Sequence, residues 1–516
     1  MRIAPFTLLA AALLAARARA EVTLGPLFSD HAVLQRDKPV PVWGRADAGE
    51  TVTVSFLGRR VAAQAGPDGR WIALLGALPA TAEGSDLVAA GKTTATIHDV
   101  VVGEVWLASG QSNMEYVVDD PNGPVFHVDH AAAEVAAARY PLIRHFKVAR
   151  RVAAEPAETA AGGWAPCSPA TVPEFSAVGY FFARALFLRL GVPVGIVNST
   201  WGGTPVEAWL SPLALASDPA FAVVDRRWRE TLAAYPRAQE AAQAALAAWR
   251  PAAEAARRGG PLAYTLFLKA HPQPQAAHGP GDPWTPTGLF DGMINPLLPY
   301  ALRGAIWYQG ESNAARPGEY HALFAAMITA WRAHFGQGDF PFYWVQLADY
   351  NVPGDPTGAS WAWLREAQAQ TLSLPNTGQA VTIDIGDLGN IHPSNKQEVG
   401  RRLALLAKLN AYSIPGDCSG PVFVSATPEG RALRLRFKYA DAGLTAGLTP
   451  LQSFEVAGAD RKFYPATAAI AGSTVLVQSP AVPEPVAVRY AWRNAPTANF
   501  YNGAGLPAVP FRSDRW

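Results

Sequence analysis

The chain has little cysteine and almost no net charge. Only Cys167 and Cys418 occur among 516 residues, so neither a disulfide scaffold nor a zinc site organises the fold. In an exported protein these two thiols can pair, and two buried free thiols are an equal alternative. The 43 basic and 42 acidic residues give a formal charge of +1, and no basic run indicates a nucleic-acid partner or a membrane surface.

Long apolar runs are also missing after the N-terminus. No later stretch of about 18 apolar residues lacks charges, so we expect no membrane-spanning helix in the mature protein. The first 20 residues combine Arg2, an apolar run over 3–16 and an Ala-Arg-Ala exit. This pattern is typical of a cleaved secretory signal, so we expect a signal peptide at 1–20 and a secreted or periplasmic protein.

Both ends of the mature chain are built from short alternating segments separated by turn residues. Residues 21–100 predict an N-terminal β-sandwich-like domain, and residues 419–516 predict a C-terminal β domain. The segments that carry this interpretation are 40–43, 51–56, 71–74 and 94–97 at the front, and 433–437, 453–456, 474–477 and 487–490 at the back.

The middle of the chain has a different rhythm. A long apolar segment at 175–190 predicts a buried helix, and the short apolar strand expected at 194–198 follows it, which is typical of a doubly wound parallel sheet. We assign 101–216 and 290–418 to this α/β core. Residues 217–289 are rich in Ala and charge and then in Pro, and we interpret them as a helical and Pro-rich insertion that covers one side of the sheet.

Further core elements follow the insertion. We expect strands at 303–308, 342–347 and 380–384, and helices at 321–334, 363–372 and from Ser394, where Ser394 and Gln397 form a candidate capping box.

One stretch organises the whole chain, residues 100–114. It begins as a β-branched run, which predicts a buried strand, and breaks at Gly110 into Gln111, Ser112 and Asn113. A serine on such a strand-to-helix turn presents its hydroxyl just past the carboxyl end of a strand. In α/β sheets, active sites lie at these strand ends.

Every predicted strand of the core ends in a similar switch from apolar to polar residues. The carboxyl ends of parallel strands share one edge of the sheet, so these residues are expected to meet there. The polar segments are 110–113, 198–204, 309–313, Asp349, 384–387 and 391–393.

A serine and a histidine at one edge are the parts for nucleophilic acyl transfer. Ser112 is the candidate nucleophile and His392 the candidate base, because a seryl hydroxyl needs a base to take its proton. The histidine needs an acceptor on its other nitrogen, for which Asp387 is the first choice and Asp384 the second.

The oxyanion of a tetrahedral intermediate needs preorganised donors. The candidates are the backbone N–H of Ser112, the N–H of Gly202 or Gly203, and the side-chain amides of Gln309 and Asn313. Candidate substrate-binding residues are Gln111, Trp201 and Glu311. No metal and no cofactor are expected.

These segments together resemble a known family. Gly110-Gln111-Ser112-Asn113-Met114, Trp201-Gly202-Gly203-Thr204, residues 307–313 (Trp-Tyr-Gln-Gly-Glu-Ser-Asn), residues 384–387 with 391–393, and the segments 27–36 and 290–296 are similar to the sialate O-acetylesterase group of SGNH hydrolases. The resemblance spans most of the mature chain.

The resemblance implies a three-layer α/β/α, flavodoxin-like core and removal of acetyl groups from sugar hydroxyls without a metal. It places the nucleophile on Ser112, the base on His392 and oxyanion donors on the glycine turn and on 309–313. The implied substrates are acetylated sialic acids or acetylated plant polysaccharides such as xyloglucan and xylan. Many SGNH enzymes carry an aspartate three residues before the histidine, where this chain has Gly389, so a Ser–His dyad helped by a backbone carbonyl stays open beside Asp387.

Three alternatives stay open at this point. The first is another acyl hydrolase of the lipase or amidase type. The second is a non-catalytic glycan-binding protein, against which the Ser and His pair at one edge argues, since binding alone needs no nucleophile and base. The third is a metal hydrolase using Asp384, Asp387 and His392, although these residues show no known metal-binding spacing. The oligomeric state is left open as well.

Overall fold

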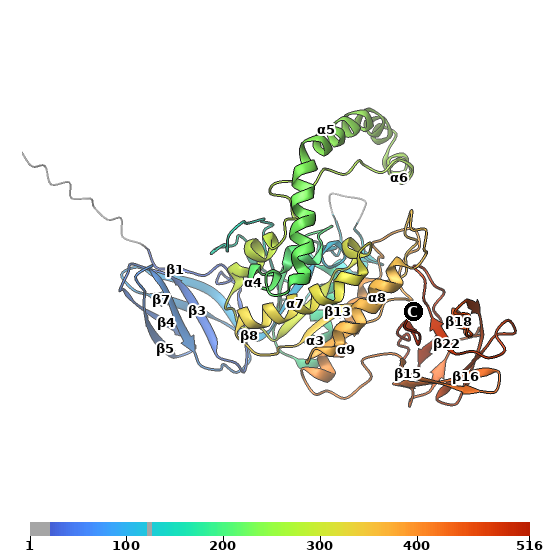
Figure 1. The fold of residues 1–516 in the computed structure, drawn as a ribbon. Coiled ribbons are helices and arrows are strands. Elements are labelled where there is room, and N and C mark those ends of the chain that lie inside the picture. Colours follow the sequence, from blue (N-terminus) through green and yellow to red (C-terminus); the bar gives the residue numbers. More distant parts are fainter. Residues whose placement is uncertain (1–20, 121–125) are drawn as a thin grey trace, which may run out of the picture.

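A computed structural model describes residues 21–120 and 126–516. An N-terminal β domain, a central α/β domain and a C-terminal β domain follow one another across the molecule, and a long helical arm rises from the centre (Figure 1). The expected signal peptide, 1–20, lies outside the described residues.

The central sheet is parallel except at one edge. Its strand order is β10-β9-β11-β8-β12-β13-β14, and only β10 runs antiparallel to its neighbour. The strands are β8 (Thr94–Gly110), β9 (Ile143–Lys147), β10 (Trp164–Pro166), β11 (Val194–Thr200), β12 (Gly304–Tyr308), β13 (Phe342–Val345) and β14 (Thr377–Ala380). The sequence did not predict β9 and β10, which are short and carry charged or proline residues.

Helices cover both faces of this sheet, as the alternation along β13 shows. Tyr343 points to one face, where it stacks on Trp106 at 5.8 Å between ring centroids, and Trp106 in turn meets Phe182 of α3 (Ala177–Leu190). The adjacent Trp344 points to the other face and meets Phe324 of α7 (Pro317–Phe335) at 5.2 Å. Successive side chains of a strand alternate in this way, so both faces must be apolar and covered.

Four long helices form these covers, and the core also has three short helices. They are α3 (Ala177–Leu190), α7 (Pro317–Phe335), α8 (Ser360–Gln370) and α9 (Lys396–Asn410), with α1 (Ser112–Glu115), α2 (Ala131–Ala137) and α4 (Pro212–Leu215). The start of α9 differs from expectation. Asn395, not Ser394, caps it by accepting from the Glu398 N–H at 3.1 Å, while the Ser394 hydroxyl donates to Asp129.

A single strand joins the N-terminal domain to the core. The first half of β8 pairs with β7, and its second half pairs with β11 and β12. The boundary we placed between residues 100 and 101 therefore falls inside one continuous strand. The other strands of this domain are β1 (Thr23–Leu24), β2 (Val33–Gln35), β3 (Val40–Arg45), β4 (Thr51–Phe56), β5 (Arg59–Gln64), β6 (Arg70–Leu75) and β7 (Thr81–Ala90).

The C-terminal β domain has an apolar core of its own. Val381 and Ile383 leave the central sheet to join that core, packing with Leu435 and Val456. For this reason β14 ends at Ala380. The strand expected over 380–384 is therefore wrong, because the observed strand ends where the expected one begins. The domain's strands are β15 (Val422–Glu429), β16 (Ala432–Lys438), β17 (Leu444–Thr445), β18 (Phe454–Ala457), β19 (Phe463–Pro465), β20 (Thr467–Ala471), β21 (Thr474–Gln478), β22 (Ala487–Tyr490), β23 (Tyr501–Asn502) and β24 (Phe511–Arg512).

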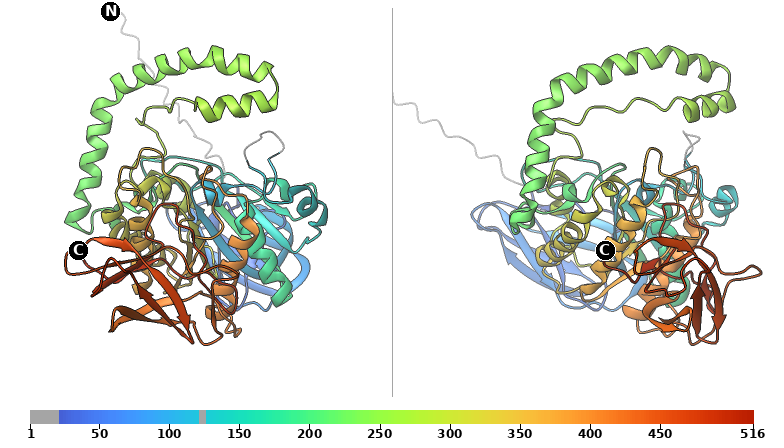
Figure 2. Two further views of the ribbon diagram at one scale, coloured as in Figure 1. Left: turned by 90° about the vertical axis from the view of Figure 1, so that its right-hand side faces the viewer. Right: turned by 45° about the vertical axis from the view of Figure 1, so that its right-hand side comes forward.

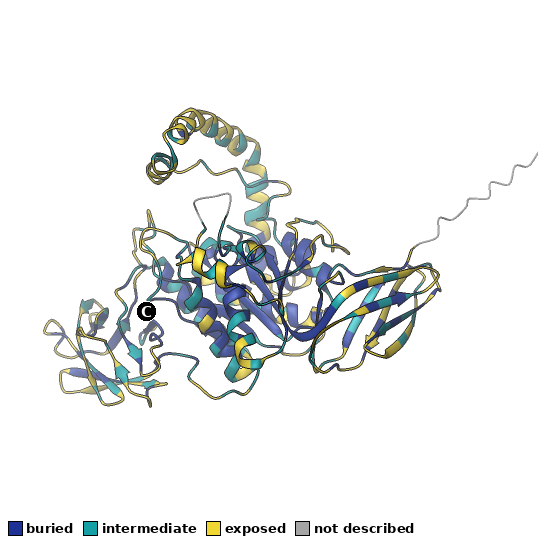
Figure 3. Cartoon of the chain, turned by 180° about the vertical axis from the view of Figure 1, so that it is seen from behind, coloured by how far each residue is buried: buried dark blue, intermediate teal, exposed yellow. Residues whose placement is uncertain are grey.

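The insertion forms an arm and does not cover the sheet as expected. Helix α5 (Ala222–Arg258) leaves the body, curves, and turns back through α6 (Pro261–Ala270) (Figures 1 and 2). Only Val224 and Ala253 of α5 are buried, and Figure 3 shows the arm mostly exposed beside the buried core. Two internal prolines, Pro236 and Pro251, account for bending in a helix of this length.

Both cysteines are buried free thiols, which decides between the two states that the sequence left open. Within the described ranges, no helix combines the length and the apolar character needed to cross a membrane.

Candidate active site

Ser112 and His392 meet at the carboxyl edge of the central sheet. Ser112 is the first residue of α1, directly after β8, and His392 lies in the loop between β14 and α9. His392 Nε2 lies 2.8 Å from Ser112 Oγ, a hydrogen bond between residues that are 280 positions apart. The structure therefore brings together the two residues that the sequence indicated as nucleophile and base.

Gly110 makes the turn that presents Ser112. Its φ is +128°, and a Cβ at this position would lie 2.2 Å from the carbonyl oxygen of Tyr308 on the neighbouring strand. Gln111 N–H then donates to that same carbonyl at 2.9 Å. Because no larger residue fits against β12 here, the sharp exit of the strand depends on this glycine.

The environment of His392 favours a neutral ring. Burial, with the nearby charge of Lys396 as a second cause, lowers the pKa of His392 to about 4. The ring of Phe126 stands edge-on to the imidazole at 5.4 Å and adds to its desolvation. A neutral imidazole bonded to a seryl hydroxyl is ready to accept its proton.

Neither candidate aspartate is hydrogen-bonded to His392. Asp387 is exposed and its Oδ1 accepts from the Gly389 N–H at 2.8 Å, which closes a tight turn. Asp384 forms a bidentate ion pair with Arg402 at 2.6 and 2.8 Å, and both side chains are almost fully buried. In the part of the chain that the structure describes, the only hydrogen bond of the His392 ring is the one to Ser112.

The glycine turn after β11 lies against the nucleophile. A Cβ on Gly202 would stand 3.3 Å from Ser112 Cβ, so this turn and α1 are in contact. The Gly202 N–H donates a hydrogen bond to Glu115 Oε2 at 2.8 Å. Gly203, at φ +75°, finds no acceptor for its N–H among the described residues, which leaves it as a free backbone donor of the turn. The Ser112 N–H, at the start of α1, likewise has no acceptor within its own helix.

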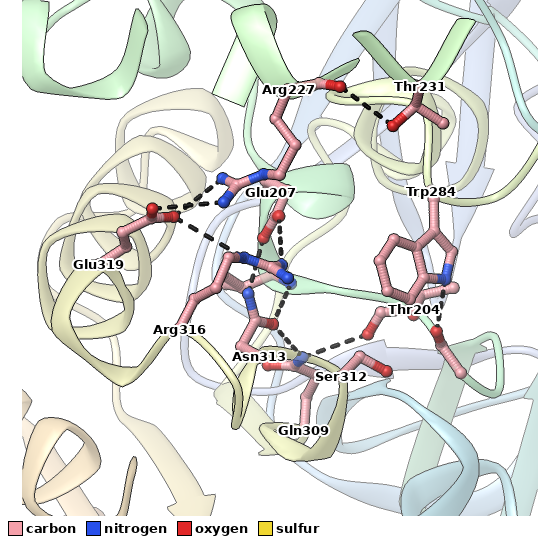
Figure 4. A network of polar contacts seen from close by, with 12 residues as sticks. Thr204, Glu207, Arg227, Thr231, Trp284, Gln309, Ser312, Asn313, Arg316 and Glu319 are labelled. Carbon is pink, nitrogen blue, oxygen red and sulfur yellow. Dashed lines mark hydrogen bonds and ion pairs between the residues drawn. The ribbon is translucent and has the colours of Figure 1, made fainter. Parts of the chain in front are cut away.

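The amides of Gln309 and Asn313 have different roles (Figure 4). Gln309 Nε2 donates to Thr204 O and to Asn313 Oδ1, and its Oε1 accepts from Tyr320, so the whole amide is occupied. Asn313 Nδ2 donates to Glu207 Oε2 at 2.8 Å and keeps a second hydrogen. Gln309 is therefore a support for Asn313, and only Asn313 can serve as an amide donor.

The three candidate substrate-binding residues also differ. Gln111 Oε1 is buried and accepts from the Gly310 and Ser312 N–H groups, which holds the turn after β12. Glu311 accepts from Asn113 at 2.6 Å, and burial raises its pKa. Trp201 is half-buried, with the guanidinium of Arg150 at 5.4 Å over its ring, and is the one of the three open to a ligand.

Sequence reasoning gave no role to three polar residues beside the dyad: Asn113, which it noted only as part of the polar segment 110–113, and Glu115 and Lys396, which it missed. A signal for Lys396 was present, because it falls on the same helical face as Val399 and Leu403 and had to be buried with them. Glu115 and Asn113 gave no signal, since their partners come from distant loops. Among the described residues, no group of three or more His, Cys, Asp or Glu side chains is arranged to hold a metal ion.

A seryl hydroxyl bonded to an imidazole at the carboxyl edge of a parallel sheet is typical of serine hydrolases with an α/β fold. Residues 282–408 match the family model "Carbohydrate esterase, sialic acid-specific acetylesterase". A crystal structure of a carbohydrate acetylesterase from Xanthomonas citri superposes with a TM-score of 0.80 and 39% identity, covering 96% of this chain and 100% of that one. The chain belongs to the sialate O-acetylesterase family of carbohydrate esterases and is a carboxylic ester hydrolase.

Curated relatives agree over nearly the full length. Sialate O-acetylesterase from Rattus norvegicus is 29% identical over 531 residues, covering 94% of this chain and 93% of the relative. The Homo sapiens protein of the same name is 28% identical over 541 residues, covering 93% and 90%.

Proposed function

We propose that this protein is an exported serine esterase that removes O-acetyl groups from carbohydrates through an acetyl-enzyme. The observation that carries the proposal is the 2.8 Å contact between Ser112 Oγ and the desolvated ring of His392. The central domain is proposed to be a three-layer SGNH core, which agrees with helices on both faces of a parallel sheet. Export rests on the signal-like pattern of residues 1–20.

The proposed first half-reaction forms the acetyl-enzyme. Ser112 Oγ attacks the acetyl carbonyl carbon while His392 Nε2 takes the hydroxyl proton. The carbonyl oxygen becomes an oxyanion that accepts hydrogen bonds from the Gly203 and Ser112 N–H groups and from Asn313 Nδ2. Collapse breaks the bond to the sugar oxygen, which leaves with the proton that His392 returns.

The second half-reaction is hydrolysis of that acetyl ester. Water attacks the acetyl carbon as His392 takes one of its protons, and acetate leaves when Ser112 Oγ regains a proton. In both half-reactions the proton acceptor is the side chain of His392, so we expect no cofactor requirement.

The substrate is proposed to be an acetylated sugar, either sialic acid or a plant polysaccharide such as xyloglucan or xylan. The return segment of the arm supports binding of an extended substrate, because Trp284 lies at the glycine turn and donates to Gly203 O at 2.7 Å. His278 stacks on Trp284 at 4.1 Å. Stacked rings at the glycine turn offer apolar faces of the kind that sugar rings pack against.

Replacing the nucleophile tests the proposal. Ser112→Ala is expected to lower kcat for an aryl acetate by at least about 10³-fold, because the covalent step is lost, while the melting temperature stays close to that of the unaltered protein. Activity near the unaltered level in Ser112→Ala would refute the assignment.

A substrate panel separates the acetylesterase from its rivals. We expect acetate release from acetylated sialic acid or from acetylated xyloglucan or xylan fragments, and weak turnover of long acyl esters. Faster turnover of long acyl esters would favour a lipase-like enzyme, and tight sugar binding without acetate release would favour a binding protein.

A further inference from the structure

A lysine is buried directly behind the dyad. Lys396 has no exposed surface, and its Nζ donates to Asn113 Oδ1 at 2.6 Å. The rest of its surroundings are aromatic, with the ring of Tyr116 at 4.6 Å and that of Tyr308 at 5.5 Å. Burying an ammonium group is costly, so its place next to the site calls for a reason beyond packing.

Asn113 connects this lysine to both halves of the dyad. It follows Ser112 directly in the chain, and its Nδ2 donates to the carbonyl oxygen of Ile391 at 3.0 Å. Ile391 directly precedes His392. This bond therefore links the segment that carries Ser112 to the loop that carries His392, next to the two reacting side chains. The same Nδ2 donates to Glu311 Oε1 at 2.6 Å, which uses both amide hydrogens.

The partners of Asn113 fix how its amide is turned. A lysine ammonium can only donate and the Ile391 carbonyl can only accept, so Asn113 must point its oxygen at Lys396 and its nitrogen at Ile391 and Glu311. With the amide held in this orientation, Nδ2 always faces the Ile391 carbonyl. Loss of the Lys396 or the Glu311 contact removes one of the bonds that hold the amide.

We propose that Lys396, Asn113 and Glu311 form a positioning relay that sets the spacing and orientation of His392 against Ser112. The inference rests on the proposed function. In this view, His392 is held in place through the backbone next to it, at the Ile391 carbonyl, and not through its ring. The three are positioning residues, because their side chains hydrogen-bond to one another and to the Ile391 carbonyl and not to Ser112 Oγ or the His392 ring. The relay supplies, from behind the dyad, the orientation that neither Asp387 nor Asp384 provides.

Three variants test the relay: Lys396→Met, Glu311→Gln and the double variant. Lys396 and Glu311 each favour the charged form of the other, so each single variant leaves one buried ionisable group without that partner, and both a lower melting temperature and a lower kcat are expected. The double variant has no such unpartnered group and should regain much of the melting temperature. If the relay positions the base, kcat in the double variant stays about 10- to 100-fold low, with KM changed less than about threefold, because the Asn113 amide is no longer held.

Arg332→Met is the matched control. Arg332 is also a buried cation, and it donates to the carbonyl oxygens of Phe340 and Pro375 with no contact to the site. It should lower the melting temperature while kcat per folded molecule stays within about twofold of the unaltered protein.

The outcomes separate the relay from the proposed function. Labelling of Ser112 by an organophosphate and acetate release by the unaltered protein test the function, and their absence refutes that function. With both present, recovery of kcat together with the melting temperature in the double variant shows a purely structural role and overturns the relay. An unchanged kcat in Lys396→Met would overturn the relay as well.

Discussion

At the scale of single residues, the proposed base is shaped by desolvation. Among the described residues, the His392 ring has one hydrogen bond, to Ser112, with the Phe126 ring and the Lys396 charge nearby. Both influences disfavour the imidazolium, so the ring stays neutral in the resting enzyme. Such a base is weak, and its efficiency depends on being held in place.

This environment predicts the acidic side of the pH profile. His392 is active when neutral, and its pKa is lowered to about 4 by burial and by Lys396. The value of kcat/KM should therefore stay level from neutral pH down to about pH 5, and fall as the pH drops through 4 and His392 takes up a proton. Aryl acetate kinetics between pH 3 and 8 measure this limb, with recovery of activity at pH 7 as the control for unfolding. A limb centred near 6.5 would contradict a desolvated base.

Asp387 gives a second prediction at this scale. Its carboxylate closes the turn at Gly389, and an asparagine can accept the same hydrogen bond. We therefore expect Asp387→Asn to retain kcat within about threefold, whereas loss of a true triad aspartate costs about 10⁴-fold. A drop of that size would mean that the loop closes on His392 during turnover.

At the scale of elements, the arm is an independent unit. Its base is tied to the core by an ion pair between Arg227 of α5 and Glu319 of α7 at 2.8 Å, part of the network that leads through Arg316 towards Asn313 (Figure 4). Beyond this base, α5 is rich in alanine and charged residues, and Ala253 is its one buried residue. A helix of this kind adds little to the stability of the body.

Shortening the arm tests that description. The ring of Tyr235 lies against Gly279, so the chain can be closed there by replacing 237–277 with a short Gly-Ser linker. The melting temperature and aryl acetate turnover should change little, within about twofold for kcat, while kcat/KM on a polysaccharide falls if the arm holds substrate. Loss of aryl acetate turnover would show instead that the arm stabilises the glycine turn through Trp284.

At the scale of the molecule, a few long-range links hold three domains as one body. The continuous strand β8 carries the N-terminal domain into the core, and the segment after β14 joins the C-terminal domain through Val381, Ile383 and the pair of Asp384 with Arg402. This pair is buried and bidentate, so it fixes the position of the segment after β14 against α9.

Asp384→Asn should therefore act on stability and leave the chemistry intact. Removing Asp384 leaves Glu398, at 2.7 Å, as the remaining carboxylate partner of the buried Arg402, so the cost should be less than the about 3–5 kcal/mol of a fully uncompensated buried charge. We expect a clearly lower free energy of unfolding in urea, with kcat per folded molecule nearly unchanged. A loss of kcat at full stability would return Asp384 to the catalytic machinery.

The amino-acid sequence by itself determined which chemical groups are present and where most of the helices and strands lie. Apolar periodicity located α3, α7, α8 and α9 and the strands β8, β11, β12 and β13, because these segments bury whole faces or stripes and must be apolar there. It also singled out Ser112 and His392, which the structure brings together, since their chemistry and their places after strands can be read locally. The short strands β9 and β10 and the exposed arm lack that periodicity, and their form or placement was missed.

Only the tertiary structure decided what each polar residue does. Local sequence states which groups a residue carries, but their partners lie up to several hundred positions away, and folding alone sets those distances. That is why Gln309 became a support, Asp384 an ion-pair partner of Arg402, and Asp387 the cap of a turn. It is also why Lys396, buried among aromatic rings with Asn113, came to stand behind the dyad.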